Sequence, residues 1–410
     1  MLNLRINAQR LWDTIMETAE FGKTPKGGIK RLTVSDLDKK VRDWFVAKCK
    51  EAGCTVTVDE MGNIFALRPG RDNSLPPIAC GSHLDTQPTG GKFDGVLGVL
   101  AGLEVVRTLN DAGIETNAPI MVANWTNEEG SRFAPAMLAS GVYAGAITLE
   151  DAYQLADKDG LKFGEELERI GYKGKEKVGA QKFGAFFELH IEQGPILEAE
   201  GRTIGVVTDG QGQRWYDCRV VGRESHAGTT PMPLRRDALA AAAKVILAVQ
   251  EIALSKAPNG VGTVGVLDIA EPSRNVIPGT VTFTAEFRHP DDATLDEMDQ
   301  ALRAAAARAA EEQQVEIEIE AIWHYPAVKF DEGCVAAVRN ATEAMGYGYR
   351  EIISGAGHDA CYVNRVAPTS MIFIPCENGI SHNEIENAEF DHCAAGANVL
   401  LHAMLSKANA

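Results

Sequence analysis

One short stretch of the chain holds three side chains that could do chemistry. Between Gly81 and Gly95 the sequence reads GSHLDTQPTGGKFDG, which sets His83, Asp85 and Asp94 among small, turn-forming residues. A chain that only had to fold would seldom place an imidazole and two carboxylates in one such loop. The stretch therefore raises the question of a catalytic or metal-binding site.

A second candidate is a pair of adjacent glutamates. Glu128 and Glu129 follow the apolar run PIMVANW (119–125), which we expect to form a buried strand. Adjacent residues at the end of a strand point in different directions, so one carboxylate can bind a metal while the other faces elsewhere. Taken alone, such a pair more often forms a solvated turn. Its place at the same predicted sheet edge as His83 and Asp94 favours the functional interpretation.

Two further histidines lie near loops of the same predicted domain. His190 stands in ELHIEQGP at the end of a predicted strand (185–190), and His382 stands in NGISHNE. Each alone would more often be a structural histidine. Together, three histidines and two acidic groups at one sheet edge offer what a pair of divalent cations needs, namely neutral imidazoles and a carboxylate able to bridge. Asp85 suits a hydrogen bond to the second ring nitrogen of His83, which would fix that imidazole.

Strands and helices alternate in the part of the chain that must position these side chains. We expect a buried strand at 77–82, a helix at 95–113 and a buried strand at 119–125. This alternation is typical of an α/β fold with a mostly parallel sheet flanked by helices, in which ligands bind beyond the carboxyl ends of the strands. An amphipathic helix is expected upstream, between Ser35 and Gly53.

The pattern changes near residue 210 and changes back near 327. In between, the sequence predicts a strand, a helix, two strands, a helix and a strand, at 215–222, 234–255, 261–269, 280–289, 294–312 and 315–323. This β-α-β-β-α-β order is that of an α+β ferredoxin-like unit. We therefore expect an inserted domain at 211–326 and a first domain formed by 1–210 and 327–410.

The bulk composition excludes several classes of protein. The 410 residues are 45% hydrophobic and carry a net charge of −17. With no apolar run of membrane-spanning length, this composition favours a soluble two-domain protein and argues against nucleic acid or anionic lipid as a partner. The amino terminus lacks a signal-peptide pattern and the eight cysteines form no C-x-x-C pair, so reduced thiols and a cytoplasmic location are expected. An anionic substrate would need a local cationic group.

Nine motifs spread over the chain resemble those of one enzyme family. They are GSHLDT, GGKFDG, WTNEEGSRF, FFELHIEQGP, GRESHAGTTPM, SRNVIPG, FRHP, SGAGHDA and ISHNE. As a set they are similar to the motifs of metal-dependent amidohydrolases of the M20 peptidase superfamily. Within it they resemble the hydantoinase/carbamoylase branch, which includes N-carbamoyl-L-amino acid hydrolases, β-ureidopropionases and allantoate amidohydrolases.

The resemblance implies a role for each candidate ligand. His83 and His190 would hold one divalent ion. Glu129 and His382 would hold the other, and Asp94 would bridge the two. Zn²⁺ or Mn²⁺, with Co²⁺ or Ni²⁺ as alternatives, can in such a pair lower the pKa of water and polarise a carbonyl.

Two further acidic residues complete the implied catalytic set. Glu128 would be the general base that takes the proton of the attacking water and returns it to the leaving nitrogen. Asp85 would orient His83 beside it.

The remaining motifs imply how the substrate is held. Arg288 would clamp the substrate carboxylate through a bidentate pair, although an arginine on the polar face of a strand is more often only solvated. Gln193 and Asn275 would donate hydrogen bonds to the substrate, and Gly357 with His358 would line the pocket wall.

His226, in GRESHAGTTPM, would reach the substrate from the partner subunit. The resemblance thus implies a homodimer joined through the inserted domain, which would also act as a lid. On its own, this histidine would be a loop residue without a role.

The implied reaction is hydrolysis of the ureido C–N bond of an anionic N-carbamoyl amino acid, giving the free amino acid, CO2 and ammonia. Allantoate amidohydrolase and β-ureidopropionase activities are the alternatives within the branch. Aminopeptidases and dipeptidases of the superfamily are less similar, because they mostly carry a carboxylate at the position of His190 and lack Gln193. An inactive binding protein on the same fold is disfavoured because Glu128 and every ligand position are filled.

Overall fold

A computed structural model describes residues 3–410 of the chain. The chain forms two compact units: unit 1 runs to Thr208 and resumes at Lys329, and unit 2 is the continuous stretch Asp209–Val328. The limits of unit 2 lie two residues outside the insertion that the sequence predicts at 211–326. The roles of the units as catalytic domain and dimerisation or lid domain stay predictions.

Unit 1 is built around a nine-stranded sheet. Its strands lie in the order β1 (Thr55–Val58), β2 (Ile64–Arg68), β4 (Ile120–Trp125), β3 (Ile78–His83), β5 (Ala185–Ile191), β16 (Thr369–Ile374), β6 (Ile204–Gly210) and β14 (Val328–Lys329), with β15 (Tyr349–Ser354) beside β6. The four central strands β4, β3, β5 and β16 are parallel neighbours, and antiparallel pairs join β1 to β2, β2 to β4 and β6 to β16. Every residue of these four strands is buried, as expected for parallel strands covered on both faces. The predicted α/β fold with a mostly parallel sheet is confirmed.

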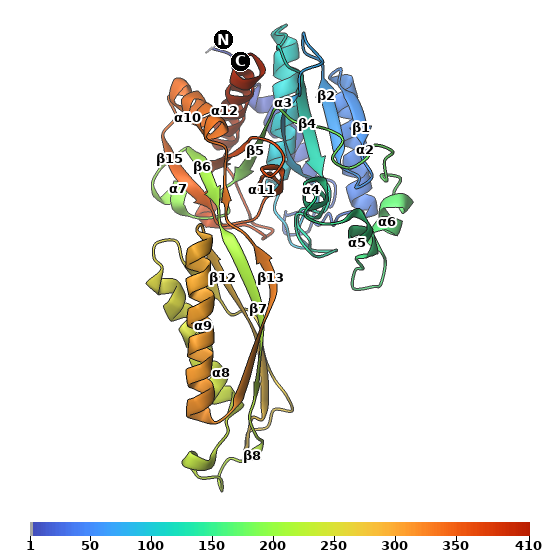
Figure 1. Cartoon of the computed structure of the whole chain (residues 1–410). Helices are drawn as coiled ribbons and strands as arrows, with labels where there is room; N and C mark the ends of the chain where they lie inside the picture. Colours follow the sequence, from blue (N-terminus) through green and yellow to red (C-terminus); the bar gives the residue numbers. More distant parts are fainter. Residues whose placement is uncertain (1–2) are drawn as a thin grey trace. The chain divides into compact units, whose positions relative to one another are not determined.

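Helices cover this sheet. They are α1 (Ala8–Ala19), α2 (Asp36–Glu51), α3 (Val96–Asp111), α4 (Leu138–Tyr143), α5 (Leu149–Gln154), α6 (Phe163–Arg169), α7 (Ile196–Ala199), α10 (Glu332–Met345), α11 (Asp359–Val363) and α12 (Phe390–Ala408), with a 3-10 turn η2 (Glu377–Gly379). The helices α3 and α12 pack against the central strands (Figure 1). The N-cap of α2 is the predicted Ser35, whose side chain accepts the backbone N–H of Asp38.

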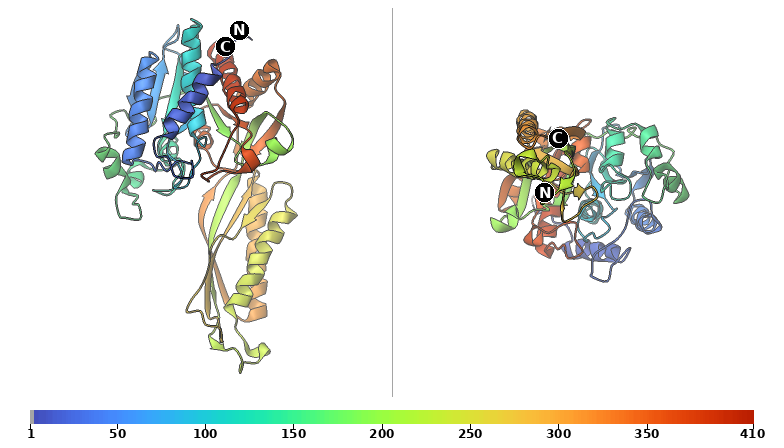
Figure 2. Two further views of the ribbon diagram at one scale, coloured as in Figure 1. Left: turned by 180° about the vertical axis from the view of Figure 1, so that it is seen from behind. Right: turned by 90° about the horizontal axis from the view of Figure 1, so that it is seen from below.

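Unit 2 is an antiparallel sheet covered by two helices. The sheet order is β10 (Leu267–Ile269), β12 (Thr280–His289), β7 (Gly212–Val221) and β13 (Glu316–Tyr325), with β9 (Val261–Thr263) beside β12. The helices α8 (Ala238–Ser255) and α9 (Asp292–Gln313) lie on one face of this sheet (Figure 2). A separate pair, β8 (Ser225–His226) with β11 (Val276–Ile277), and a 3-10 turn η1 (Met232–Leu234) complete the unit.

The single strand predicted at 261–269 is wrong, because the structure divides it into β9 and β10. Thr263 pairs with Glu286, whereas Leu267 pairs with Phe283. Four steps along one strand thus oppose three steps along the other, which leaves one residue unpaired as in a β-bulge.

The helix α8 is long and apolar enough to cross a membrane by length and composition. Its inward residues pack with β7, β12 and α9 into the unit 2 core; they are Ala238, Ala241, Ala242, Val245, Val249 and Ala253. In this structure α8 therefore packs one face into the core of unit 2 and leaves its other face, with Leu247 and Leu254, exposed.

Candidate metal centre and active site

The predicted metal ligands converge at the carboxyl ends of the central strands of unit 1. His83 is the last residue of β3, and His190 lies one residue before the end of β5. Glu129 follows β4, and His382 lies in the loop after β16. Asp94 stands just before α3. Because β3, β4, β5 and β16 are parallel neighbours, these segments meet at one edge of the sheet.

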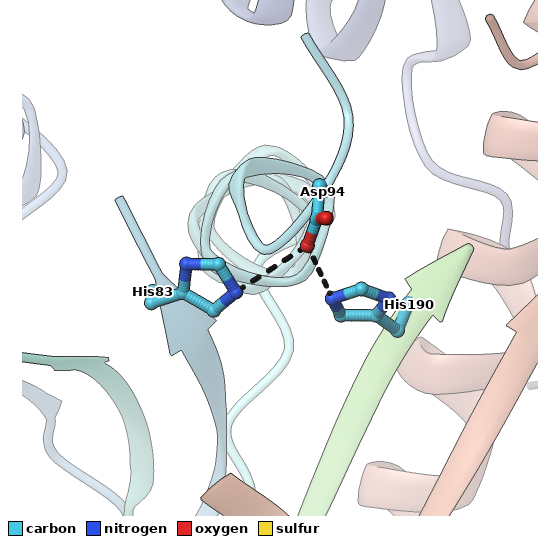
Figure 3. Close-up of side chains that lie close together, drawn as sticks. All are labelled: His83, Asp94 and His190. Atoms are coloured by element: carbon cyan, nitrogen blue, oxygen red, sulfur yellow. Dashed lines mark ion pairs between the residues drawn. The ribbon is translucent and has the colours of Figure 1, made fainter. Parts of the chain in front are cut away.

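The first ligand group is formed by His83, Asp94 and His190. Figure 3 shows Asp94 between the two imidazoles, with its Oδ1 3.5 Å from Nε2 of His83 and 3.1 Å from Nε2 of His190. All three residues are buried. One ligand atom from each could reach a single metal ion.

Gly95 allows this close approach. A Cβ atom at this position would lie 2.3 Å from Nε2 of His83, and the backbone φ of +67° belongs to the left-handed region that glycine tolerates best. The glycine therefore places the start of α3 directly against the imidazole of His83.

The second ligand group lies at the other oxygen of the Asp94 carboxylate. Oδ2 of Asp94 lies 3.4 Å from Nε2 of His382, which in turn lies 3.5 Å from Oε2 of Glu129. These three residues form a separate set of atoms able to share an ion. The Asp94 carboxylate thus stands between two sets of nitrogen and oxygen donors, which is the arrangement that a bridged pair of divalent cations requires.

Backbone carbonyls orient the two buried imidazoles. Nδ1 of His83 lies 2.9 Å from the backbone oxygen of Asp85, and Nδ1 of His190 lies 2.9 Å from that of Ile191. Donation from Nδ1 leaves each Nε2 lone pair directed at the metal site. The sequence predicts that the Asp85 carboxylate accepts this hydrogen bond from His83. The prediction is wrong, because Oδ1 of Asp85 lies 4.0 Å from Nδ1 of His83.

The Asp85 carboxylate instead holds the turn after β4. Its two oxygens accept the backbone N–H groups of Glu128 and Glu129, at 3.4 and 3.3 Å. Gln87 fixes the Glu129 side chain through its backbone N–H (3.0 Å) and its amide (2.6 Å). Oε2 of Glu128 lies 3.4 Å from Nε2 of His83, so this second carboxylate also faces the site.

Burial makes the charge state of these carboxylates unusual. It raises the pKa of Glu128 well above its ordinary value and raises the pKa of Glu129 to about 7. Burial would also raise the pKa of Asp94, but hydrogen bonds from the surrounding histidines, His190 first, hold it well below its ordinary range. Without bound cations, this concentration of buried negative charge is unfavourable, and divalent ions would compensate it.

Three residues around the site adopt left-handed backbone conformations that non-glycine residues seldom take. The φ angles of Asn127, Gln193 and His382 are 58°, 57° and 53°. Such conformations cluster at functional sites, where the surrounding structure enforces them. The Gln193 side chain faces the candidate ligands: its Nε2 donates to Oδ2 of Asp94 at 2.9 Å and lies 3.3 Å from Nε2 of His382.

Gly357 and His358 precede α11, and the His358 ring packs 4.4 Å from the ring of His190 between their centroids. His358 is buried beside this candidate ligand, and its Nε2 has no hydrogen-bond partner among residues 3–410. His358 therefore packs against the first ligand group on the side of His190.

The other predicted substrate residues belong to unit 2. His226 lies in β8 opposite Val276 of β11, and the backbone oxygen of Asn275 accepts the N–H of Ala227. Arg288 lies on β12 and forms an ion pair with Glu286 at 3.2 Å. Unit 2 therefore brings His226 and Asn275 together and sets Arg288 elsewhere on its sheet.

Two buried carboxylates near the site escaped the sequence interpretation. Glu386 touches the backbone of Asp94, and Glu188 accepts hydrogen bonds from Ser82 and from the backbone N–H of Ala360. Glu188 lies two residues before His190 on the same strand, and Glu386 lies four residues after His382. This short spacing from two predicted ligands is the sequence feature that could have indicated both carboxylates.

Comparison with known proteins places the whole chain among enzymes. The sequence profile described as Peptidase family M20/M25/M40 matches residues 79–406. An N-carbamoyl-L-amino-acid amidohydrolase from Rhizobium meliloti is 53% identical over 406 residues, covering 99% of this chain and 98% of the relative. The N-carbamoyl-L-amino acid amidohydrolase of Geobacillus stearothermophilus is 37% identical over 406 residues, covering 97% and 98%.

Solved structures agree with the sequence relatives. The crystal structure of an amidase of the hydantoinase/carbamoylase family from Burkholderia multivorans matches with a TM-score of 0.95 and 59% identity, covering 99% of this chain and 98% of that chain. A tripeptidase from Staphylococcus aureus matches with a TM-score of 0.70 at 16% identity, a likeness that concerns the fold alone.

Proposed function

The chain belongs to peptidase family M20/M25/M40, and on that premise we propose that it is a metal-dependent amidohydrolase acting on N-carbamoyl-L-amino acids. It hydrolyses the ureido C–N bond and releases the free amino acid, CO2 and ammonia. The observation that carries the chemistry is the Asp94 carboxylate, whose two oxygens face two separate ligand groups. The substrate class is supported by the full-length relatives of that name, which are 53% and 37% identical.

The metal centre in this proposal holds two divalent ions. His83 and His190 would hold one, Glu129 and His382 would hold the other, and Asp94 would offer one carboxylate oxygen to each group. The nitrogen and oxygen donors suit Zn²⁺, Mn²⁺, Co²⁺ or Ni²⁺. When bound, such ions supply the positive charge that activates water and polarises the carbonyl under attack.

Glu128 is the general base. Its carboxylate is buried and lies 3.4 Å from Nε2 of His83, so it faces the first ligand group. A raised pKa brings a carboxyl group nearer to the operating pH, where a base accepts and returns a proton most effectively. Glu128 takes the proton of the attacking water and delivers it to the leaving nitrogen. Asp85 keeps Glu128 in place through the backbone of the turn.

Arg288 binds the carboxylate of the substrate, because a planar guanidinium recognises a carboxylate with two parallel hydrogen bonds. A local cation is needed here, since the whole chain carries a net charge of −17. The amide of Gln193 donates to Asp94 in the structure, and in this proposal Gln193 also binds the substrate. Gly357 with His358 lines the wall.

The enzyme works as a homodimer in which His226 and Asn275 act on the substrate of the partner subunit. Thr280, the first residue of β12, pairs with Val221, and Arg288 pairs with Gln213 eight residues further along. Eight extended residues span about 27 Å. His226 pairs with Val276, four residues before β12 begins, whereas Arg288 lies near the end of β12. This placement within one chain supports a site that is shared between two chains.

Eight free, buried cysteines fit a reducing compartment, and a cytoplasmic location stays a prediction.

A substrate panel tests the function. Metal-free protein would be loaded with Zn²⁺, Mn²⁺, Co²⁺ or Ni²⁺ and assayed on N-carbamoyl-L-amino acids, N-carbamoyl-β-alanine, allantoate, ureidoglycolate and dipeptides. Ureidoglycolate is included because a relative named ureidoglycolate hydrolase from Arabidopsis thaliana is 33% identical. We expect the highest kcat/KM on N-carbamoyl-L-amino acids. A higher kcat/KM on any other class would contradict the proposed substrate.

A further inference from the structure

A buried carboxylate outside the ligand groups contacts the backbone of the bridging residue. Glu386 is 4% exposed. Its Oε1 accepts the backbone N–H groups of Phe93 and Asp94, both at 3.1 Å. Its Oε2 accepts the hydroxyl of Ser381 at 2.9 Å. One side chain thus joins the loop that carries Asp94 to the residue next to His382.

The loop before Asp94 is shaped to fit Glu386. A Cβ atom at Gly91 would lie 2.1 Å from Oε1 of Glu386 and 2.4 Å from its Cβ, so any larger residue would displace the carboxylate. Gly348 of the same unit offers a contrast, because a Cβ atom there would meet its nearest neighbour, Nη1 of Arg202, only at 3.9 Å.

A second connection passes through Ser381. The Ser381 hydroxyl lies 3.2 Å from Oδ2 of Asp94 as well as 2.9 Å from Glu386, and it accepts a hydrogen bond from Gln193 at 3.1 Å. Oδ2 is the Asp94 oxygen that faces His382. Glu386 therefore contacts both the backbone and, through Ser381, the side chain of the bridging residue on the side of the second ligand group.

The two ligand groups differ in how much they need this support. His83 and His190 lie on buried strands, and their Nδ1 atoms contact backbone oxygens close to them in the chain. His382 instead lies in a loop, with a side chain that is 52% exposed. The geometry of the second group depends on how that loop is held against Asp94.

We propose that Glu386 is a positioning residue that sets the affinity of the ion bound by Asp94, Glu129 and His382, and has little effect on the ion bound by His83, Asp94 and His190. This inference rests on the proposed two-metal function. Residues that hold metal ligands typically change metal affinity by about 10–100-fold when they are removed.

The test is a Co²⁺ titration of the metal-free full-length protein, followed by visible absorption and by competition with a chromophoric chelator, so that the two binding steps are resolved without substrate. Glu386→Ala should weaken the second equivalent of Co²⁺ by at least about tenfold and change the first by less than about threefold. Glu386→Gln should restore the second step to within about threefold, because its amide oxygen can accept both N–H groups and its NH2 can donate to Ser381.

Gly91→Ala provides an independent perturbation in case Glu386→Ala does not fold. It should weaken the second step in the same way, whereas the control Gly348→Ala, in the same unit but with open space at the added Cβ, should leave both steps unchanged. Equal weakening of both steps, or an unchanged second step in Glu386→Ala and Gly91→Ala, would overturn the role of Glu386. A wild-type protein that takes up fewer than two equivalents would instead contradict the two-metal function, and this role with it.

Discussion

The carboxylate of Asp85 accepts the backbone N–H of Glu129, with 3.3 Å between Oδ2 and the nitrogen. Its other oxygen accepts the N–H of Glu128 at 3.4 Å. Asp85 therefore acts on the proposed base and on the proposed ligand beside it through the peptide backbone. Asp85→Asn replaces one acceptor by an NH2 group, which cannot accept an N–H.

We expect Asp85→Asn to lower kcat at least about tenfold while changing KM for the substrate much less, because it loosens the turn and leaves the substrate contacts in place. Steady-state kinetics on an N-carbamoyl-L-amino acid, with metal content measured in parallel, tests this. An unchanged kcat would show that the turn holds its geometry without Asp85.

The two adjacent glutamates should separate chemistry from metal binding. Glu128→Gln should keep both ions and lower kcat by at least about 100-fold, the low end of general acid–base contributions. Glu129→Gln should lose metal as well, because Oε2 of Glu129 faces His382 in the second group. Metal analysis and kcat for both variants decide the assignment. Near-normal turnover in Glu128→Gln would mean that another group is the base.

Metal removal should expose a pH dependence of stability. Burial raises the pKa of Glu129 and of Glu386 to about 7, from ordinary values of 4.5. Between those values the folded chain keeps protons that the unfolded chain has lost, so the free energy of unfolding falls as pH rises from about 4.5 to 7. The hydrogen bond with Asp94 raises the pKa of His382 to about 9, so its contribution is present below pH 6.5 and is lost towards pH 9.

Both effects destabilise the metal-free protein as pH rises, whereas bound cations compensate the same negative charges. The difference in Tm between metal-loaded and chelator-treated protein should therefore widen from pH 5 to pH 8. Calorimetry across this range measures it. A difference that stays constant or narrows would contradict these pKa directions.

The sequence predicts the residues that one strand and its loop bring to the site, but not the contacts that form only when distant segments meet. His83 and Asp94 could be placed because a buried strand ending in a polar loop brings such residues to the sheet edge. The partner of His83 could not, because a backbone oxygen leaves no mark in the sequence and lies closer than the Asp85 carboxylate. Glu386 was missed because its role depends on two loops that meet only in the folded chain.

The guanidinium of Arg288 should matter for substrates that carry a carboxylate. Arg288→Ala should raise KM for N-carbamoyl-L-amino acids strongly, since it removes a bidentate charge-assisted pair, and Arg288→Lys should recover only part of the loss. The control substrate is the corresponding amide, which lacks the carboxylate. Equal losses on both substrates would mean that Arg288 supports the fold of unit 2 rather than the ligand.

The most distinctive prediction concerns His226, which should complete the active site of the other subunit. Within one chain, His226 pairs with Val276 just ahead of β12, whereas Arg288 lies near the other end of β12, eight residues after Thr280. His226→Ala and Glu128→Gln, each inactive alone, would be unfolded together and refolded as a mixture. If His226 acts in the partner's site, a mixed dimer has one site with both defects and one site with neither.

Random pairing makes about half of the dimers mixed, so roughly a quarter of all sites should regain activity. If His226 acts within its own chain, every site of a mixed dimer keeps one defect and no activity returns. Different affinity tags on the two variants show that mixed dimers have formed, and gel filtration of the wild type checks the oligomeric state. A shared site would give each mixed dimer one site with both residues intact. Activity no higher than the sum of the two variants, in a sample with proven mixed dimers, would therefore rule out the shared site.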